Sequence, residues 1–446
     1  MKMRDWKSHT TRAAAFALLC VTAPYAPAAK AAIQTPQPTQ APQQTQSPRP
    51  APAQTPQTAP PAHSTQPAQT TQPAQGTQPA QTPQPQATPA EAVRAIAPPR
   101  NPLPPEEKSA GITRFSFIVY GDTRGRRDGV QIQHEHSLVV DSMLAAAKQL
   151  EQTPYPVRFV LQSGDAVFDG RDVRQWNTSF VELVNRLTVD GGIPYFLAPG
   201  NHDVSPAASL TSPDRQKGLR NYLSAVSQLI PADTATRRLA GYPTYAFGYG
   251  NTFVVALDSN IASDDKQFEW VSQQLRGLDR ARYTNVVAFF HHPPFSSGPH
   301  GGAKVGPVAA TMRTRYMPLF REHRVKALFM GHEHLYEHWV ERYVDAAGRR
   351  QRIDMVITGG GGAPPYAHSG EPDLTAYIAA NQAAKVTLEH LVRPGPARGD
   401  NPYHWVLVKV DGEKLSIEVF GVDWGVGFRP YRSSKVTLED EVVPPQ

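Results

Sequence analysis

VKALFMGHEHLYEH, residues 325–338, is the stretch that decides the fold expected for this chain. Its apolar run up to Met330 predicts a buried strand, and Gly331 lets the backbone turn without a side-chain clash. His332 and His334 follow at the strand end, where open α/β sheets bind ligands. A single pair of histidines is more often an ordinary feature of a surface or a core, so its interpretation depends on partners elsewhere in the chain.

The same pattern, an apolar run that ends in glycine or polar residues, recurs along the chain and predicts further strands. These runs cover residues 115–120, 157–162, 193–198, 253–257, 286–290 and 353–358. Between two of them, residues 264–280 place their apolar side chains on one helical face. Strands that alternate with helices predict a layered α/β fold.

Two hairpins indicate that the sheets are mixed and not purely parallel. Residues 405–410 and 414–420 flank Asp411-Gly412, which is a strong turn signal between two strands. Residues 245–258 predict a second hairpin that turns at Gly250-Asn251. A sheet built from both kinds of segment contains parallel and antiparallel neighbours.

The first 31 residues resemble a secretory signal peptide. A basic start precedes the apolar segment 13–21, which is too short to span a bilayer as an ordinary helix. Ala29-Lys30-Ala31 is the expected cleavage site, with Ala26-Pro27-Ala28 as the alternative. We therefore expect a periplasmic or secreted protein.

Residues 32–105 are rich in Pro, Gln, Thr and Ala and contain almost no large apolar side chains. Such a segment cannot bury enough surface to offset the entropy lost on ordering. We expect a disordered, partly polyproline-like tether that holds the globular part away from a membrane or a cell wall. Residues 106–446 are expected to form the globular domain.

Charge and cysteine content exclude several classes of protein. The formal net charge of +6 arises within the first 105 residues, so residues 106–446 are neutral and predict no nucleic-acid-binding surface. Cys20 is the only cysteine, which excludes an internal disulfide, a zinc ribbon and a cysteine nucleophile in the globular part. No stretch after the leader predicts a membrane span.

Five strand ends carry polar side chains that can bind metal ions. They are Asp122, Asp165, Asn201 with His202, His291, and His332 with His334. Taken alone, each of these motifs more often forms a turn, caps a helix or simply follows a strand. Five such strand ends in one chain are not a coincidence. Carboxylate, amide and imidazole ligands without thiolates suit Mn, Fe or Zn. So many groups exceed the needs of one ion, whereas two ions bridged by a carboxylate would use six of them.

The ordered motifs GDTR (121–124), GDAVFDG (164–170), GNHD (200–203), HHPP (291–294) and GHEH (331–334) resemble the calcineurin-like metallophosphoesterase superfamily. The longer stretch GHEHLYEH resembles its purple acid phosphatase branch. The order of the motifs is the specific part of the resemblance, which covers roughly residues 112–362. It implies an α/β fold, a layered sandwich of two mixed β-sheets flanked by helices, with residues 106–446 as the catalytic domain.

The resemblance also implies a site for two metal ions, Mn, Fe or Zn. The ligands of the first ion would be Asp122, His334 and the bridging Asp165, and those of the second would be Asp165, Asn201, His291 and His332. A hydroxide bridging the two ions would attack phosphorus directly. No Ser, Cys or His nucleophile motif stands out, so no phospho-enzyme is expected.

Two neighbouring residues would assist the departing group. The resemblance places His202 beside the leaving-group oxygen as general acid or orienting group, with Asp203 fixing its tautomer. The glycine run 359–362 is interpreted as a tight turn under the site, although it could also allow close backbone approach to a phosphate.

The chain departs from the family pattern at two positions. Many members have Asp-x-His in the first motif, where this chain has Arg124, and purple acid phosphatases have a Tyr where this chain has Phe168. The first ion therefore lacks one expected protein ligand. Arg124 could hold a phosphate oxygen, since its fork suits that role, or it could face solvent. His134 or His136 could supply the missing ligand, although His136 also fits the start of a helix over 137–150.

These observations predict an exported metal-dependent phosphoesterase that acts on a small-molecule phosphate mono- or diester. A phosphodiesterase or nucleotide hydrolase on the same site is one alternative, because the loops 205–233 and 296–314 would shape the pocket. The second alternative is a non-catalytic exported binding protein of this fold, which the altered first motif leaves open. The six retained ligands argue against it.

Overall fold

The computed structural model describes residues 91–125, 132–204, 211–301 and 305–423, with the backbone of residues 427–430 and 439–442. The predicted signal peptide and most of the predicted tether lie outside the described residues. The assignment of residues 91–105 to the tether was wrong, because Ile96 is fully buried in the core. The N–H of Ile96 also donates to the carbonyl of Ala225 at 2.8 Å. Val93 and Leu103 pack against the same core. A few apolar side chains and such backbone pairing thus order a Pro-rich segment that composition alone assigns to the tether.

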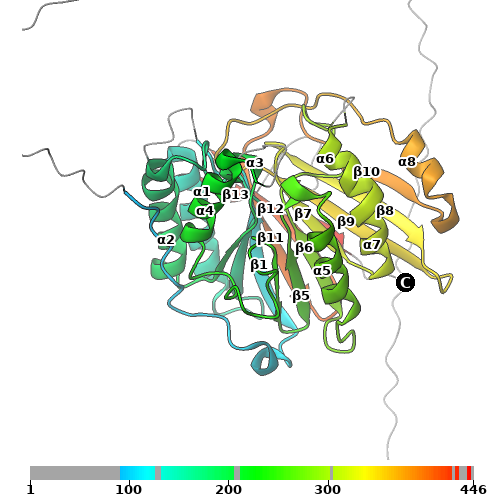
Figure 1. Ribbon diagram of the computed structural model, residues 1–446, viewed down its shortest axis with the longest axis horizontal. Helices are drawn as coiled ribbons and strands as arrows, with labels where there is room; N and C mark the ends of the chain where they lie inside the picture. Colours follow the sequence, from blue (N-terminus) through cyan, green and yellow to red (C-terminus); the bar gives the residue numbers. More distant parts are fainter. Residues whose placement is uncertain are drawn as a thin grey trace, which may run out of the picture. The chain divides into compact units, whose positions relative to one another are not determined.

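One seven-stranded sheet carries the first three metal-capable strand ends (Figure 1). Its order is β13-β12-β11-β1-β2-β3, and β14 pairs with β12. Its strands are β1 Arg114–Tyr120, β2 Val157–Gln162, β3 Tyr195–Leu197, β11 Tyr403–Asp411, β12 Lys414–Asp423, β13 Gly427–Pro430 and β14 Glu439–Val442. β1, β2 and β3 are parallel, whereas β11 and β12 form the predicted antiparallel hairpin. Gly412 has a φ of 61° in its turn, a conformation that glycine adopts freely.

The second seven-stranded sheet has the order β10-β8-β9-β7-β6-β5-β4. Its strands are β4 Tyr245–Tyr249, β5 Thr252–Ala256, β6 Asn285–Phe289, β7 Ala327–Met330, β8 Tyr336–Val344, β9 Arg350–Thr358 and β10 Thr387–Val392. β5, β6, β7 and β9 are parallel neighbours, and β4 and β8 pair antiparallel with β5 and β9. The second predicted hairpin, β4–β5, is therefore confirmed.

Helices cover the outer faces of the two sheets (Figure 1). The α-helices are α1 His134–Leu150, α2 Glu182–Asn185, α3 Asn201–Val204, α4 Pro213–Ala225, α5 Asp265–Arg276, α6 Pro307–Thr311, α7 Met317–Glu322 and α8 Thr375–Ala380. The π-helical turns are η2 Gln175–Val181, η3 Arg186–Asp190 and η5 Met312–Tyr316. The short 3₁₀ turns are η1 Glu106–Ser109, η4 Ser259–Ile261, η6 Gln382–Ala384 and η7 Arg398–Asp400. α1 is tied to β11 where the indole N–H of Trp405 donates to Ser142 Oγ at 2.8 Å. On the second sheet, Phe320 of α7 stacks on Phe290 with ring centroids 6.2 Å apart.

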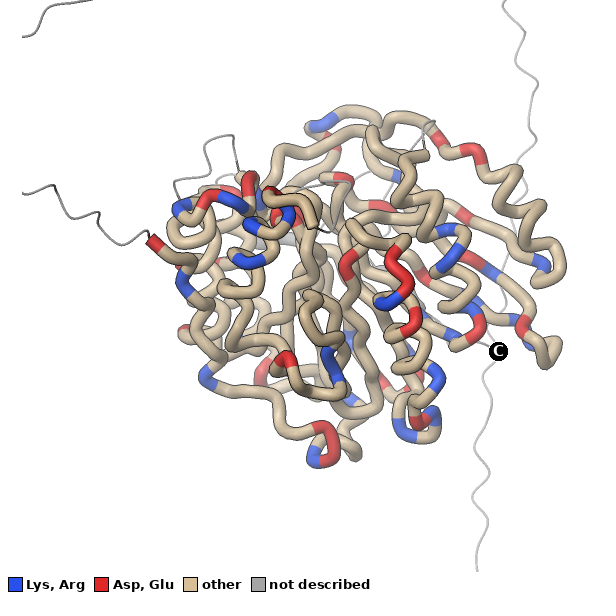
Figure 2. The backbone as a smooth tube through the Cα atoms, viewed as in Figure 1, with Lys and Arg blue, Asp and Glu red and all other residues tan. Residues whose placement is uncertain are grey.

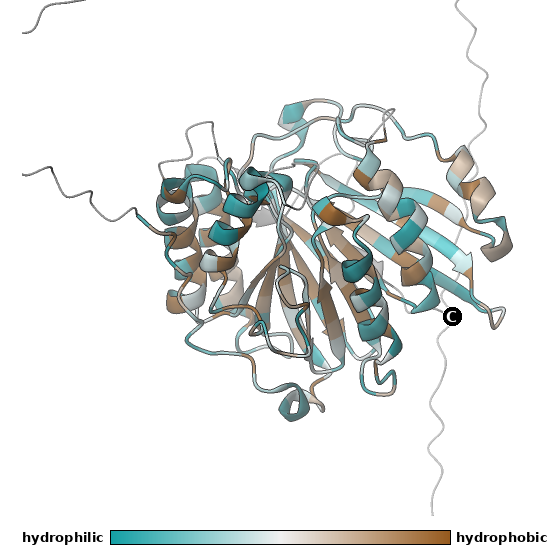
Figure 3. Cartoon of the chain, in the orientation of Figure 1, coloured by the Kyte–Doolittle hydropathy of each residue, from teal (hydrophilic) through white to brown (hydrophobic). Residues whose placement is uncertain are grey.

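The core lies between the sheets, whose strands are largely apolar (Figure 3). Phe117 of β1 meets Phe329 of β7 edge to face, with ring centroids 5.9 Å apart. Phe115 and Tyr249 make a similar contact at 4.9 Å. These contacts join the two sheets in one buried cluster and confirm the predicted sandwich of two mixed sheets flanked by helices. Within the described residues, no helix is both long and apolar enough to cross a membrane.

Candidate active site

The predicted ligands gather at one end of the sandwich, because parallel strands of both sheets end there. They are Asp122 after β1, Asp165 after β2, Asn201 after β3, His291 after β6, and His332 and His334 after β7. The short helix α3, which begins with Asn201, lies at the upper end of the sheets in Figure 1. The order of the parallel strands thus brings these separate strand-end motifs together in one site.

Three of the predicted ligand residues have left-handed backbone conformations. The φ angles are 58° at Asp122, 54° at Asp165 and 71° at His332. Each such non-glycine residue costs about 1–3 kcal/mol. Backbone hydrogen bonds hold them there, because Asp122 N–H donates to Gly164 O at 2.9 Å and His332 N–H donates to the Asp122 carboxylate at 2.9 Å. Strain concentrated on adjoining ligands is typical of a functional site.

In the Asn201 cluster, which comprises Asp165, Asn201, His291 and His332, lone pairs converge on one point. Asn201 Oδ1 lies 3.0 Å from His291 Nε2 and 3.1 Å from His332 Nδ1, and the two ring nitrogens are 3.2 Å apart. His291 Nδ1 donates to the Ser163 carbonyl at 3.0 Å, so its Nε2 carries a lone pair. Two acceptors, Asn201 Oδ1 and His291 Nε2, therefore face each other, and a cation bound between them would stabilise the arrangement.

The protonation states of the Asn201 cluster suit a metal ion. Burial lowers the pKa of His291, and lowers that of His332 well below its ordinary value. Burial alone would raise the pKa of Asp165, but the neighbouring imidazoles of His291 and His202 and the Arg124 guanidinium outweigh it and lower that pKa. Asp165 Oδ1 lies 3.3 Å from His291 Nε2. Neutral imidazole and ionised carboxylate are the forms that ligate metals.

The Arg124 cluster, which comprises Asp122, Arg124, Asp165 and His334, differs because a cation already lies among its acceptors. Arg124 Nε donates to Asp165 Oδ2 at 3.1 Å, and Nη2 donates to His334 Nε2 at 3.2 Å. His334 Nδ1 donates to the Pro364 carbonyl at 2.9 Å, which leaves the Nε2 lone pair free to accept. Asp122 Oδ1 lies 3.5 Å from the same Nε2. The Arg124 side chain is 13% exposed, so the alternative in which it faces solvent was wrong.

His202 lies on the open side of the site, with 26% of its side chain exposed. Its Nδ1 donates to the Phe168 carbonyl at 2.7 Å, so the predicted pairing with Asp203 was wrong. Asp203 is buried and accepts N–H groups of Gly200 at 2.8 Å and Val167 at 3.2 Å. Successive side chains of a helix diverge by about 100°, which directs Asp203 away from the ring of its neighbour in α3.

Two side chains at the site were missed by sequence reasoning. A ring nitrogen of His292 lies within 4.8 Å of those of His291 and His332. Tyr366 stacks on His334 with ring centroids 4.0 Å apart. The position of His292 directly after a predicted ligand was a usable signal, whereas nothing in the sequence near Tyr366 marks it.

The suggestion that His134 or His136 supplies a missing ligand was wrong. His136 is fully buried in α1, and its Nε2 lies 3.1 Å from the Tyr120 hydroxyl. Burial lowers the pKa of His136 to about 3. His134 begins α1 and is exposed. Neither belongs to a potential metal-binding group among the described residues.

Glycines let the strand ends approach each other closely. A Cβ on Gly331 would lie 2.2 Å from Asp122 Oδ2, and one on Gly359 would lie 2.2 Å from the Glu333 carbonyl. Both distances are below any real van der Waals contact. The glycine run 359–362 therefore packs closely against the strand ends under the site, with Gly361 N–H donating to the Gly121 carbonyl at 2.8 Å. The tight turn stays a prediction.

A pocket of about 370 Å³ opens beside the Asn201 cluster and includes His292, His300, His332 and Glu333 in its lining. His300 Nδ1 lies 3.4 Å from Glu333 Oε2, and this hydrogen bond raises the pKa of His300. The His300 and His332 rings are 4.7 Å apart. A substrate bound at the cluster would therefore meet His300.

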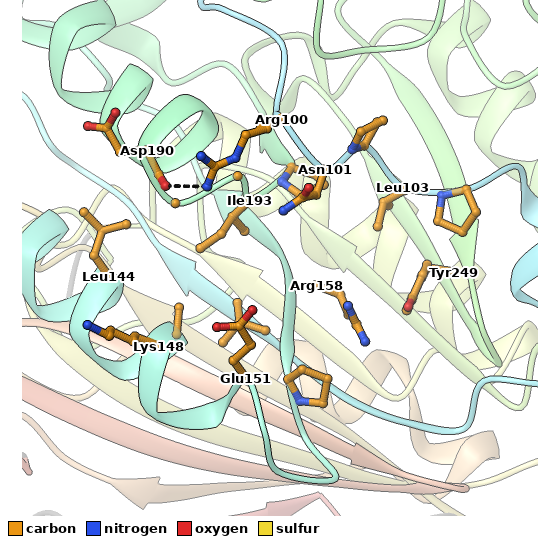
Figure 4. Close-up of a pocket in the computed structure, with 18 residues that line it drawn as sticks. Arg100, Asn101, Leu103, Leu144, Lys148, Glu151, Arg158, Asp190, Ile193 and Tyr249 are labelled. Atoms are coloured by element: carbon orange, nitrogen blue, oxygen red, sulfur yellow. Dashed lines mark hydrogen bonds between the residues drawn. The ribbon is translucent and has the colours of Figure 1, made fainter.

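A larger pocket of about 560 Å³ lies elsewhere and is drawn in Figure 4. Arg100, Lys148 and Arg158 are among its lining residues, and Arg100 donates to the carbonyl of Asp190 at 3.0 Å. None of the six predicted ligands lines it. The six predicted ligands therefore lie at the strand-end site and not in this larger pocket.

Known proteins share this sequence pattern. The pattern of the family described as Calcineurin-like phosphoesterase matches residues 117–336. The serine/threonine-protein phosphatase CPPED1 of Bos taurus is 27% identical over 215 residues, which cover 46% of this chain and 59% of that protein. The Fe(3+)-Zn(2+) purple acid phosphatase 12 of Arabidopsis thaliana is 23% identical over 195 residues, 42% of this chain and 38% of that protein. The chain therefore spans less than two thirds of either relative.

The fold has a counterpart among solved structures. Purple acid phosphatase PPD1 of yellow lupin (Lupinus luteus) superposes with a TM-score of 0.51 at 16% identity, covering 74% of this chain and 54% of that one. The six predicted ligands all lie within residues 117–336, and the match in structure reproduces the sandwich that carries them. Residues 117–336 of this chain belong to the calcineurin-like phosphoesterase family.

Proposed function

We propose that this chain is an exported metal-dependent phosphoesterase that hydrolyses phosphate esters by direct attack of water. The observation that carries the proposal is the Asn201 cluster, where acceptors face each other at 3.0 Å beside the partly exposed His202. A cation bound between these acceptors would stabilise the arrangement. An exposed imidazole next to that cation has access to a bound ester.

The residues of the site would take different roles in the hydrolysis. Metal ions held here would activate water and neutralise the charge of the phosphate, the chemistry that such sites supply. His202 Nδ1 is held by the Phe168 carbonyl, so Nε2 is the atom that would deliver a proton to the leaving oxygen. Arg124 would bind a phosphate oxygen through N–H groups that its protein contacts do not use.

The substrate class that fits best is a small phosphate monoester. The relatives compared above are named as phosphatases, which supports a monoester. Acidic and basic positions are interspersed along the chain in Figure 2, which favours a small ester over a nucleic acid. A phosphodiester or nucleotide remains the alternative, because the pocket beside the cluster is large enough for a second substituent.

The deciding experiment is hydrolysis of p-nitrophenyl phosphate and bis-p-nitrophenyl phosphate by the full chain, with Mn, Zn or Fe added after chelation. Asp165→Asn should abolish turnover, whereas the matched change Asp141→Asn, at an exposed position of α1, should not. The preferred ester would name the substrate class. Turnover that survives in Asp165→Asn would show that the activity lies elsewhere. Absence of both turnover and bound metal would favour the non-catalytic binding protein.

Export is proposed from the basic and apolar leader and the A-x-A sequence at residues 29–31. The tether would then place the enzyme at a distance from the membrane or wall. Cell fractionation and N-terminal sequencing of the mature protein test this proposal. A mature chain that begins near residue 32 outside the cytoplasm is expected, and an unprocessed chain in the cytoplasm would refute it.

A further inference from the structure

We propose that the guanidinium of Arg124 takes the place of one metal ion, so that this chain binds a single ion, in the Asn201 cluster. The proposal rests on the proposed function and refines its metal requirement. It concerns the position at which the first motif of this chain departs from the family pattern.

The two clusters differ in how their acceptors are satisfied. In the Asn201 cluster, His291 Nε2 and Asn201 Oδ1 face each other with lone pairs and fit a metal ion. In the Arg124 cluster, the acceptors that would bind the other ion already receive N–H groups. Arg124 Nε donates to Asp165 Oδ2 at 3.1 Å and Nη2 donates to His334 Nε2 at 3.2 Å.

An ion and the guanidinium cannot share the Arg124 cluster. Both need the same lone pairs, those of Asp165 Oδ2 and His334 Nε2. An arginine stays protonated in proteins, so it cannot become neutral to admit a second cation. Its side chain is 13% exposed, and in such a poorly solvated place two positive charges repel strongly. The second ion would have to displace the side chain.

The second departure from the family pattern supports the same conclusion. Phe168 stands where purple acid phosphatases have a tyrosine, and a phenyl ring cannot ligate a metal. The Arg124 guanidinium carbon lies 5.7 Å from the centroid of the Phe168 ring, within the range of a cation–π contact. The two departures from the family pattern thus complement each other. Arg124 supplies an organic cation, and the ring face of Phe168 favours it.

With a guanidinium in place of one metal ion, the site keeps groups that can bind a phosphate. Of the five N–H groups of an arginine, the contacts with Asp165 and His334 use two. The others can bind phosphate oxygens in the forked geometry that arginine favours. A fixed guanidinium would thereby supply, without a second metal, part of the positive charge that the phosphate requires.

Metal counting tests the proposal without relying on activity. The full chain is stripped with a chelator, loaded with excess Mn, freed of unbound ions by gel filtration, and analysed for Mn per chain. Wild type should retain about one ion, and Arg124→Ala about two, because Asp122, Asp165 and His334 are then free to ligate. The electron paramagnetic resonance spectrum should change from an isolated six-line signal to an exchange-coupled one.

Controls separate this proposal from the proposed function. Arg114→Ala, the same change at the opposite end of β1, should keep one ion, and His291→Ala should lose it. Two ions in wild type, or one ion in a folded Arg124→Ala chain, would overturn the proposal and leave the phosphoesterase function standing. Failure of wild type to bind any ion, or retention of the ion by His291→Ala, would overturn both.

Discussion

The imidazole of His202 donates from Nδ1 to the backbone carbonyl of Phe168, across 2.7 Å. A main-chain carbonyl therefore orients this ring, where a carboxylate was expected. The bond leaves Nε2 directed to the open side of the site, 4.0 Å from Asp165 Oδ2. Because the carbonyl is neutral, it orients the ring without holding a positive charge on it as strongly as an anion would.

His202→Gln is expected to lower kcat by ~10²–10⁴-fold for esters with alkyl leaving groups, with metal content unchanged. The loss should be much smaller for p-nitrophenyl esters, because p-nitrophenolate departs without a proton. Comparing kcat for the two leaving groups in wild type and variant checks this. His323→Gln, at the end of α7, serves as the matched control. An equal loss for both leaving groups would show that His202 does not act as the acid.

The strand ends of the site could be predicted because their signal is local. An apolar run followed by glycine and a polar residue marks Asp122, Asp165 and Asn201, and parallel strands in order bring such ends together. The fold class followed from the same runs and from two hairpin signals. The positions of these strand ends along the chain, and so of the predicted ligands that follow them, were thus recoverable without any knowledge of tertiary contacts.

The interactions between these residues could not be predicted, because they depend on the paths of loops. The carbonyl of Phe168 has no sequence signature, so the partner of His202 was assigned to the adjacent Asp203. The direction of Arg124 was open between solvent and phosphate, because its contact with His334 joins residues 210 positions apart. Ile96 was overlooked because three apolar residues, Val93, Ile96 and Leu103, do not change the Pro-rich character of the segment.

Gly331→Ala is expected to weaken metal binding while the fold persists. The new Cβ would lie 2.2 Å from Asp122 Oδ2, at the end of a side chain that can rotate away. Rotation would remove the acceptor of the His332 N–H, which holds the strained backbone of a ligand. We expect at least a ~10-fold weaker affinity for Mn, in line with changes to groups that support metal ligands.

Isothermal titration with Mn measures this effect, and far-ultraviolet circular dichroism checks the fold. Gly111→Ala is the matched control, because a Cβ there meets nothing within 4 Å. Unchanged affinity in Gly331→Ala would mean that the position of Asp122 does not matter to the site.

The ion pair between Arg215 of α4 and Asp258 after β5 should stabilise the fold near the site. Nη2 and Oδ2 are 2.5 Å apart, and the side chains are 3% and 0% exposed. Arg215→Met would leave a buried carboxylate without its cation, and we expect it to lower the free energy of unfolding by ~3–5 kcal/mol. Urea denaturation measures the change.

The exposed pair of Arg114 and Asp411 provides the comparison, with side chains 64% and 43% exposed. Arg114→Ala should leave the denaturation midpoint nearly unchanged, because water screens such pairs. Equal effects of the two substitutions would contradict the role assigned to burial.

Lys326 should make the stability of the fold rise with pH above about 8. Its side chain is buried, and Nζ donates to Asn285 Oδ1 at 2.8 Å and to the Glu413 carbonyl at 2.7 Å. Burial lowers the pKa of Lys326 to about 8, whereas an unfolded lysine has a pKa of about 10.4. Between these values the unfolded chain binds more protons than the folded one, so the free energy of unfolding increases with pH, by at most ~3 kcal/mol in total.

Urea denaturation at pH 7, 8, 9 and 10 measures this slope for wild type, Lys326→Met and Lys148→Met. Lys148 is exposed on α1, so its variant should keep the wild-type slope. Lys326→Met removes the titrating group, and its curve should be flatter than wild type between pH 8 and 10. Parallel curves for all three proteins would show that Lys326 keeps an ordinary pKa, because only a difference in proton affinity between the folded and unfolded states produces a slope.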